Sequence, residues 1–255
     1  MHMDRNTQVL SITNVLHVRC LGAFAYRASG EWCGGPAFKS GRELLQYLVS
    51  YHHLAVPRET LADAFWPDLD GDSVIHRLHL AVSGARAALK SLFPRLDAIQ
   101  CRGGSYALHS DIVVASDMDA LFSASRNATM AEMEAAVAAS NGEYMAGERA
   151  EWMYPLRVRC AQAFLSILER LADAAEESGD VDKALDYALR LVEIDRAHEA
   201  AARRLMRLLV RCGRRGAALN EFDELARYLK RHLAIEPSAQ TKALRDAIAQ
   251  SAIVV

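Results

Sequence analysis

Residues that interrupt helices are scarce in this chain of 255 residues, which has 6 prolines and 14 glycines. Aromatic residues are also few, at 7%. A β-sandwich or β-barrel needs many turn formers and is rich in β-branched and aromatic residues. The composition therefore favours a mainly helical protein.

The chain also lacks a large net charge and long apolar runs. The chain has 30 Lys and Arg residues against 32 Asp and Glu residues, a formal net charge of −2. This balance excludes a protein that coats nucleic acids or membranes by bulk charge, but it allows a local basic surface. No apolar run approaches the ~18 residues of a membrane span, and the N-terminus lacks a signal-peptide core. We expect a soluble, cytoplasmic protein with no membrane partner.

Recognisable catalytic and metal-binding motifs are absent too. The five cysteines have neither zinc-finger nor CxxC spacing. The patterns GxSxG, HExxH, GxxxxGK[ST] and GxGxxG do not occur. Asp68, Asp70 and Asp72 lie together but lack the other ligands of a calcium loop. The sequence predicts that the protein is not an enzyme and holds neither cofactor nor metal.

The first third of the chain changes from strand patterns to helix patterns. Residues 9–38 alternate polar and apolar positions between Gly-rich turns, which predicts short strands. From Ser40 on, Leu44, Leu45 and Leu48 form the apolar stripe of a helix. A second, short helix is predicted to open at Pro57 and to close at Trp66 and Pro67.

A third helix is predicted from the loop at residues 70–73 to about Leu92. Its apolar residues recur on one side, and polar or cationic residues recur on the opposite side at spacings of three and four. After Pro94, alternation around Gly103 and Gly104 predicts a β-hairpin. Strands, three helices and a hairpin in this order are typical of a winged helix-turn-helix, whose third helix enters the DNA major groove and whose hairpin is the wing.

Local charge agrees with a DNA-binding domain. Residues 73–104 contain five Lys and Arg residues against the single carboxylate of Asp97. The near-neutral chain therefore has a segment with a net charge of +4, which favours a partner with a phosphate backbone.

The remaining chain is predicted to be helical and repetitive. A shift of 34 residues aligns Gly179 with Gly213 and Leu171 with Leu205, and 34 residues is the tetratricopeptide period. The glycines are expected to form the turns between paired helices. An earlier helix pair is predicted over about 129–146 and 150–177, and a terminal helix after Ser238 is expected to cap the stack.

These features give the fold class: mainly α with a small β component, an N-terminal winged helix-turn-helix followed by an all-α tetratricopeptide-like repeat domain. The predicted domains are a DNA-binding domain at 9–110, a connecting segment at 111–128 and a helical domain at 129–252.

In this order the motifs resemble the Streptomyces antibiotic regulatory protein type of transcription activator. Such proteins join a winged helix to a bacterial transcriptional activation domain, and the resemblance extends from about Val15 to Ile248. In the first domain it rests on Leu44, Leu45, Leu48, residues 57–61, residues 65–67, Leu78, Ser83, Arg86, Gly103, Gly104, Tyr106 and Leu108. In the second it rests on residues 142–144, 151–152, 184–185, 213–214, 217–219 and 233–238.

The third helix departs from the family pattern. His76 stands where such proteins usually have Asn, and Gly84, Ala85 and Ala87 stand near positions of basic or large residues. Fewer cations weaken phosphate contacts. The target sequence therefore cannot be inferred from the relatives.

Eight residues are the candidates for contact with DNA: Arg58, His76, Arg77, His79, Ser83, Arg86, Lys90 and Arg102. Arg86 and Lys90 are expected at phosphates, and His76, His79 and Ser83 at base edges. Arg102 is expected at the tip of the wing and Arg58 at the start of the second helix. For each, the alternative is an ordinary solvated side chain, and for Arg77 it is an ion pair with an acidic neighbour.

The sequence thus predicts a DNA-binding transcriptional activator whose partner is double-stranded promoter DNA. The resemblance implies that the helical domain contacts RNA polymerase and holds a homodimer. The basic run over 203–215 is a candidate surface for such a partner. The alternative is an adaptor or small-ligand sensor that acts through its tetratricopeptide-like groove and does not bind DNA.

Overall fold

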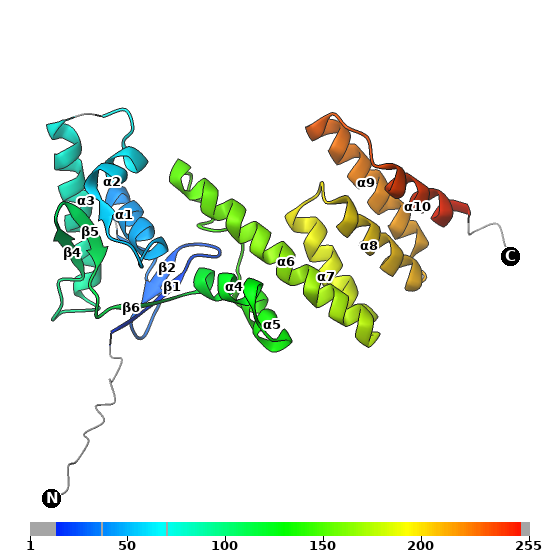
Figure 1. Ribbon diagram of the computed structural model, residues 1–255, viewed down its shortest axis with the longest axis horizontal. Coiled ribbons are helices and arrows are strands. Elements are labelled where there is room, and N and C mark those ends of the chain that lie inside the picture. The colour runs from blue at the N-terminus through cyan, green and yellow to red at the C-terminus, as the bar shows by residue number, and fades with distance from the viewer. Residues whose placement is uncertain (1–13, 37, 70, 251–255) are drawn as a thin grey trace, which may run out of the picture. The chain divides into compact units, whose positions relative to one another are not determined.

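The computed structural model describes residues 14–36, 38–69 and 71–250. The chain divides into two compact units. The first contains the residues up to Ala120 together with Ala139–Cys160, and the second contains Leu121–Ala138 and the residues from Ala161 on. Helices predominate, as predicted (Figure 1). Asp70 and the predicted domain ends at 9–13 and 251–252 lie outside the described residues.

The first unit contains a winged helix-turn-helix. Its elements in chain order are α1 (Lys39–Ser50), β3 (Val56–Pro57), α2 (Arg58–Phe65), α3 (Asp72–Lys90), β4 (Ile99–Arg102) and β5 (Ser105–Leu108). Strands β4 and β5 form the predicted hairpin, and β3 pairs with β5 on its other side. Gly103 and Gly104 have φ angles of 57° and 81°, the left-handed backbone that a tight two-residue turn requires.

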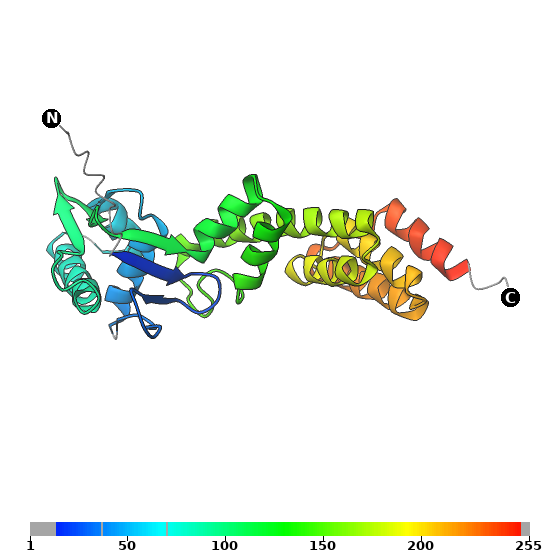
Figure 2. The same cartoon turned by 90° about the horizontal axis from the view of Figure 1, so that it is seen from below.

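A second sheet in this unit has the strand order β2 (Ala25–Arg27), β1 (Val15–Arg19) and β6 (Val113–Ser116). Strand β6 runs parallel to β1, and Figure 2 shows the two side by side. The segment 111–128, predicted as a connection, therefore holds a strand of this sheet, followed by α4 (Asp117–Arg126). The pairing involves residues about a hundred positions apart, so local sequence patterns do not reveal it.

The helix predicted over 129–146 is wrong in its second half. Helix α5 (Met130–Ala139) ends early, and the chain after it packs within the first unit. The backbone N–H of Met145 donates to Cys20 O at 2.7 Å, and that of Gly22 donates to Glu143 O at 2.9 Å. Tyr144 is buried, with its hydroxyl 2.6 Å from Ser50 Oγ. Burial of this tyrosine and a tertiary hydrogen bond thus override the helical pattern.

Trp66 and Trp152 belong to an aromatic cluster in the first unit. Trp152, on the 3-10 helix η1 (Glu151–Met153), lies 4.9 Å from Tyr47 and 6.4 Å from Phe65 between ring centroids. Phe65 in turn contacts Trp66 at 5.6 Å. The cluster ties residues 151–153 to α1 and α2.

Helices α1 and α3 cross in close contact at two glycines. A Cβ atom at Gly41 would lie 3.2 Å from the backbone of Gly84 and Ala85. A Cβ atom at Gly84 would lie 3.5 Å from Gly41 Cα, an ordinary contact distance. A methyl group at position 41 therefore fits only if the neighbouring backbone shifts by a few tenths of an ångström, whereas position 84 has room for a methyl group.

The second unit contains the predicted repeat. Helix α6 (Tyr154–Ser178), which belongs to this unit from Ala161 on, and α7 (Val181–Ile194) form one pair, and α8 (Glu199–Arg211) and α9 (Arg215–Leu233) form the next. Gly179 and Gly213 end the first helix of each pair with φ angles of 76° and 71°. Helix α10 (Ala239–Gln250) packs against α8 and α9. Among the described residues, no helix is both long and apolar enough to span a bilayer.

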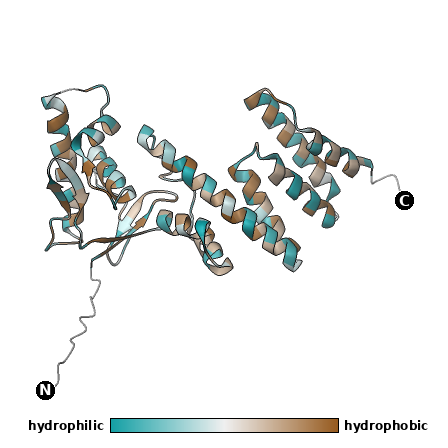
Figure 3. Cartoon of the chain, in the orientation of Figure 1, coloured by the Kyte–Doolittle hydropathy of each residue, from teal (hydrophilic) through white to brown (hydrophobic). Residues whose placement is uncertain are grey.

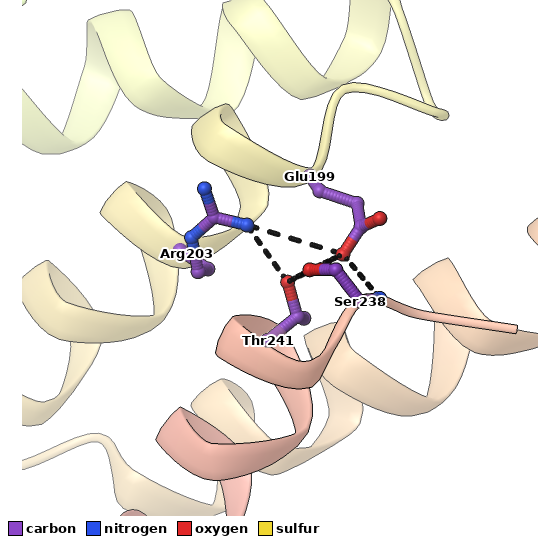
Figure 4. A network of polar contacts seen from close by, with 4 residues as sticks. All are labelled: Glu199, Arg203, Ser238 and Thr241. Carbon is purple, nitrogen blue, oxygen red and sulfur yellow. Dashed lines mark hydrogen bonds and ion pairs between the residues drawn. The ribbon is translucent and has the colours of Figure 1, made fainter.

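A polar network joins α10 to the start of α8 (Figure 4). The carboxylate of Glu199 accepts hydrogen bonds from the hydroxyls of Ser238 at 2.6 Å and Thr241 at 2.5 Å, and from the backbone N–H of Ser238 at 2.9 Å. Arg203 donates to Thr241 Oγ1 at 2.9 Å. Burial opposes the charge on Glu199, but these hydrogen bonds outweigh it and hold the pKa of Glu199 below its usual value. The network fixes the terminal helix of the stack.

The two glycines give a paired prediction. Gly84→Ala should stabilise the first unit by about 0.5–1 kcal/mol, because alanine is the better helix former and the methyl group fits. Gly41→Ala should destabilise it by about 1–3 kcal/mol, because the methyl group forces two helix backbones apart. The three tryptophans, Trp32, Trp66 and Trp152, all lie in the first unit. Tryptophan fluorescence during urea denaturation therefore measures this unit, and equal effects of the two substitutions would refute the asymmetry.

Candidate nucleic-acid interface

Helix α3 has one buried and one exposed face. Val74, Leu78, Val82, Ala85 and Leu89 are buried against the rest of the unit. The exposed face carries Asp72, His76, His79, Leu80, Ser83, Ala87 and Lys90. Both apolar and polar stretches lie along this helix (Figure 3).

The structure brings several predicted residues onto one stripe. His76, Ser83 and Lys90 are seven residues apart, so they lie nearly above one another, and His79 is adjacent to them. All four are exposed. Arg77 is also exposed but lies toward the side of the helix, and it has no ion pair with a described residue. The acidic partner considered for Arg77 is therefore not observed in the described chain.

The wing and the start of α2 lie next to each other. The backbone N–H of Arg58 donates to Gly104 O in the wing turn at 3.0 Å, and Pro57 pairs with Ser105. Arg102, opposite Ser105 in the hairpin, is exposed. The guanidinium group of Arg58 lies 2.7 Å from the carboxylate of Glu59, which offsets its charge. Arg102 is thus the less compensated of the two cations at the wing.

Arg86 connects α3 to the wing. Its Nε and Nη2 atoms donate to the carbonyl oxygen of Ile99 at 2.9 and 2.6 Å, and Nε lies 3.3 Å from Asp97 Oδ1. Strand β4 is an edge strand of its sheet, so carbonyl groups on its outer side have no strand partner. Sequence reasoning placed Arg86 at a phosphate. The structure commits its guanidinium group to an internal contact, and the phosphate contact stays a prediction.

Lys90 forms fewer internal hydrogen bonds than Arg86 does. Its Nζ atom donates to the carbonyl oxygen of Pro94 at 2.7 Å, and the side chain is exposed. An ammonium group has three donors, so two remain for another partner. Lys90 is therefore the cation of the α3 stripe that is available to a ligand.

A cavity of about 410 Å³ lies between α3 and the wing. It is lined by His79, Val82, Ser83, Arg86, Cys101 and Tyr106. Burial, together with the neighbouring Cys101, raises the pKa of Tyr106, so its phenol is neutral at physiological pH. Sequence reasoning missed Cys101 and Tyr106 as cavity residues, although their alternation in the hairpin was visible.

One of the four departures from the family pattern lies away from the exposed face. Ala85 is fully buried, so its position faces the core and not a ligand. Gly84 lies beside Gly41 but is only half-buried. His76 and Ala87 are both exposed.

The described residues contain no group of three or more His, Cys, Asp or Glu side chains that could hold a metal ion.

The basic run on α8 and α9 divides into two sets. Arg204 pairs with Asp173 and Glu176, Arg203 belongs to the Glu199 network, and Arg215 donates to the carbonyl oxygen of Ile248 at 2.6 Å. The other set, Arg207, Arg211 and Arg214, is exposed and forms no ion pair with a described residue.

Residues 114–249 match the bacterial transcriptional activator domain family. Comparison with curated proteins gives no match. The solved structure of Mycobacterium tuberculosis EmbR in complex with a low-affinity phosphopeptide is similar with a TM-score of 0.69 and 17% sequence identity. The similarity covers 92% of this chain and 65% of EmbR, so the chain spans just under two thirds of that protein's length. This likeness shows a common fold.

A second solved structure is the tetratricopeptide-containing C-terminal domain of a putative FK506-binding protein from Plasmodium falciparum. The match covers 53% of this chain and 90% of that domain, with 13% sequence identity. Its TM-score of 0.38 is too low to indicate a common fold.

The contacts of Arg86 and Lys90 predict unequal structural roles. Arg86→Met should lower the free energy of unfolding of the first unit by about 1–3 kcal/mol, because it leaves the Ile99 carbonyl without its donor. Lys90→Met should change it by less than about 0.5 kcal/mol, because water can solvate the Pro94 carbonyl. Urea denaturation followed by tryptophan fluorescence compares the two. If Arg86→Met leaves the free energy of unfolding unchanged, Arg86 does not link α3 to the wing as described.

Proposed function

The chain belongs to the bacterial transcriptional activator domain family, a family of transcription regulators and not of enzymes, and we propose that it binds promoter DNA through α3 and the β4–β5 wing. One feature carries this proposal: the exposed stripe of α3 lies on the same unit as a wing that presents a cation at its turn. In a winged helix-turn-helix, this helix enters the major groove.

The charges of the described residues support DNA as the partner. Lys90, Arg77 and Arg102 are exposed, and none forms an ion pair with a carboxylate of the described residues. These cations gain by displacing counterions from phosphates. His76, His79 and Ser83 lie between them and offer hydrogen-bonding groups to base edges. In this arrangement Lys90 and Arg102 position the domain, while His76, His79 and Ser83 read the sequence.

The helical unit is proposed to contact RNA polymerase and a second copy of the chain, as in the family that the sequence resembles. Arg207, Arg211 and Arg214 support a polymerase contact, because they form an exposed cationic surface that the fold does not use. This surface would meet an acidic region of the polymerase. The alternative function is an adaptor or ligand sensor that acts through the helical repeat without binding DNA.

DNA binding predicts a specific salt response. The full-length chain should bind one fragment from upstream of its own or neighbouring genes more tightly than ~10⁻⁶ M, the range of non-specific binding. Lys90→Ala and Arg102→Ala should each weaken binding and reduce the slope of log K against log salt by about 1. Between 50 and 200 mM salt, each variant should therefore lose about fourfold less affinity than the wild type. Fluorescence anisotropy measures both quantities.

Lys230→Ala is the matched control, because Lys230 is an exposed lysine of α9 in the other unit. It should leave the slope unchanged. If no fragment is bound above the non-specific level, DNA binding is refuted, and the adaptor function becomes the better explanation of the fold. Arg86 is unsuitable for this test, because its substitution disturbs the wing.

Separation of DNA binding from activation tests the polymerase contact. The variant Arg207→Ala/Arg211→Ala should bind the promoter fragment with unchanged affinity. Its yield in run-off transcription with purified bacterial RNA polymerase should fall about fivefold, the factor that corresponds to a loss of ~1 kcal/mol of charge interaction. The double variant Lys230→Ala/Arg231→Ala removes the same charge from α9 and should activate normally. Full activation by the first variant would exclude this surface.

A further inference from the structure

Leu80 is exposed on the outer face of α3. Its exposed fraction is 57%, which exceeds that of most large apolar residues in the described chain. Ala87, two helical turns away, is exposed as well. Leu80, Ser83 and Ala87 follow one another at spacings of three and four, so they form a strip along one side of the outer face. We call Leu80 and Ala87 the apolar strip.

The apolar strip has no role in the described fold. The core-facing residues of α3 lie on the opposite side of the helix, and they fill the contact with the rest of the unit. Ile75 is also partly exposed, at 44%, but it lies about 140° around the helix from Leu80 and is not part of the strip. An exposed leucine beside proposed DNA-contacting residues is available to a ligand with an apolar group.

The surroundings of the apolar strip select the kind of ligand. Lys90 is on the same helix face, and Arg102 is on the neighbouring wing. Asp72, at the first turn, is the acidic residue of this face. A cationic rim around a small apolar strip fits a polyanion that presents isolated apolar groups. In the DNA major groove, the apolar group on a base edge is the C5 methyl of thymine.

We propose that Leu80 and Ala87 contact thymine methyl groups in the major groove and thereby select thymines within the bound site. This inference rests on the proposed DNA binding and adds the basis of its sequence preference. The two residues lie seven positions apart, about 10.5 Å along the helix axis. With base pairs ~3.4 Å apart, a helix along the groove places the selected thymines about three steps from each other.

Base reading by this face is then mostly apolar. The exposed stripe carries neither Asn, Gln nor Arg, and its Lys90 is assigned to a phosphate in the proposed arrangement, so no residue left to read bases is one of the usual bidentate purine readers. His76, His79 and Ser83 supply single hydrogen bonds. The methyl contacts of Leu80 and Ala87 provide discrimination that the polar residues of the stripe cannot supply.

The test replaces thymine by uracil, which pairs in the same way but lacks the C5 methyl group. The probe is the bound upstream fragment, synthesised as one duplex with thymidine and one with deoxyuridine at every thymidine. The wild-type full-length chain should bind the deoxyuridine duplex about fourfold weaker for each contacted methyl group that is removed, the factor for one buried methyl-sized group. Leu80→Ala should bind the thymidine duplex weaker by a similar factor and should discriminate much less between the duplexes.

The variant and its control separate a methyl contact from other effects. Alanine is a strong helix former, so Leu80→Ala keeps α3 intact, and an uncharged substitution should leave the salt slope at the wild-type value. Leu189→Ala removes a leucine of similar exposure, 42%, from α7 in the other unit. It should discriminate between the duplexes as the wild type does.

Several outcomes would overturn the inference. Equal wild-type affinity for both duplexes, with tight binding retained, refutes methyl reading while DNA binding stands. Unchanged discrimination by Leu80→Ala places the methyl contact elsewhere. A change in oligomeric state of Leu80→Ala without DNA, measured by analytical ultracentrifugation, makes the strip a contact between copies of the chain. Failure of the thymidine duplex to bind above the non-specific level refutes the proposed function itself.

Discussion

The close crossing of α1 and α3 is the constraint on which the candidate interface depends. At Gly41 the two helix backbones approach so closely that a methyl group would touch the backbone of Gly84 and Ala85. This contact fixes the rotation of α3 about its axis, because Ala85 and its apolar neighbours must face inward. The opposite face, with His76, Ser83 and Lys90, is then presented outward as a consequence of packing.

The wing is held in position by hydrogen bonds from two arginines, Arg86 and Arg58. Two hydrogen bonds from Arg86 satisfy the outer carbonyl of Ile99 on an edge strand, and Arg58 joins the wing turn through its backbone. Because the guanidinium group of Arg86 is bound to this carbonyl, it fixes the wing against α3 and has fewer free N–H donors for a phosphate. The remaining exposed cations and the apolar strip are the features on which the proposed DNA binding rests.

The helical unit divides its charge in the same manner. Arg203, Arg204 and Arg215 stabilise the stack through carboxylates, a hydroxyl and backbone carbonyls, whereas Arg207, Arg211 and Arg214 stay in solvent. The hydrogen bonds to Glu199 lower the pKa of that carboxyl group and keep it ionised, so it can hold Ser238 and Thr241 at the start of α10. A basic run in the sequence is thus two functionally different sets of side chains.

By itself the sequence determined the features that local periodicity encodes: three helices of the first unit, a hairpin turn at Gly103 and Gly104, and helix pairs repeated every 34 residues. Spacing also identified the outer face of α3, because the direction of a helical side chain follows from its position. Only the tertiary structure decided the partner of Arg86, the contact of Gly84 with Gly41 and the strand pairing of β6 with β1. Likewise, it decided that residues after Ala139 leave the helical pattern. These features depend on contacts between residues 13 to about a hundred positions apart, for which the local pattern carries no signal.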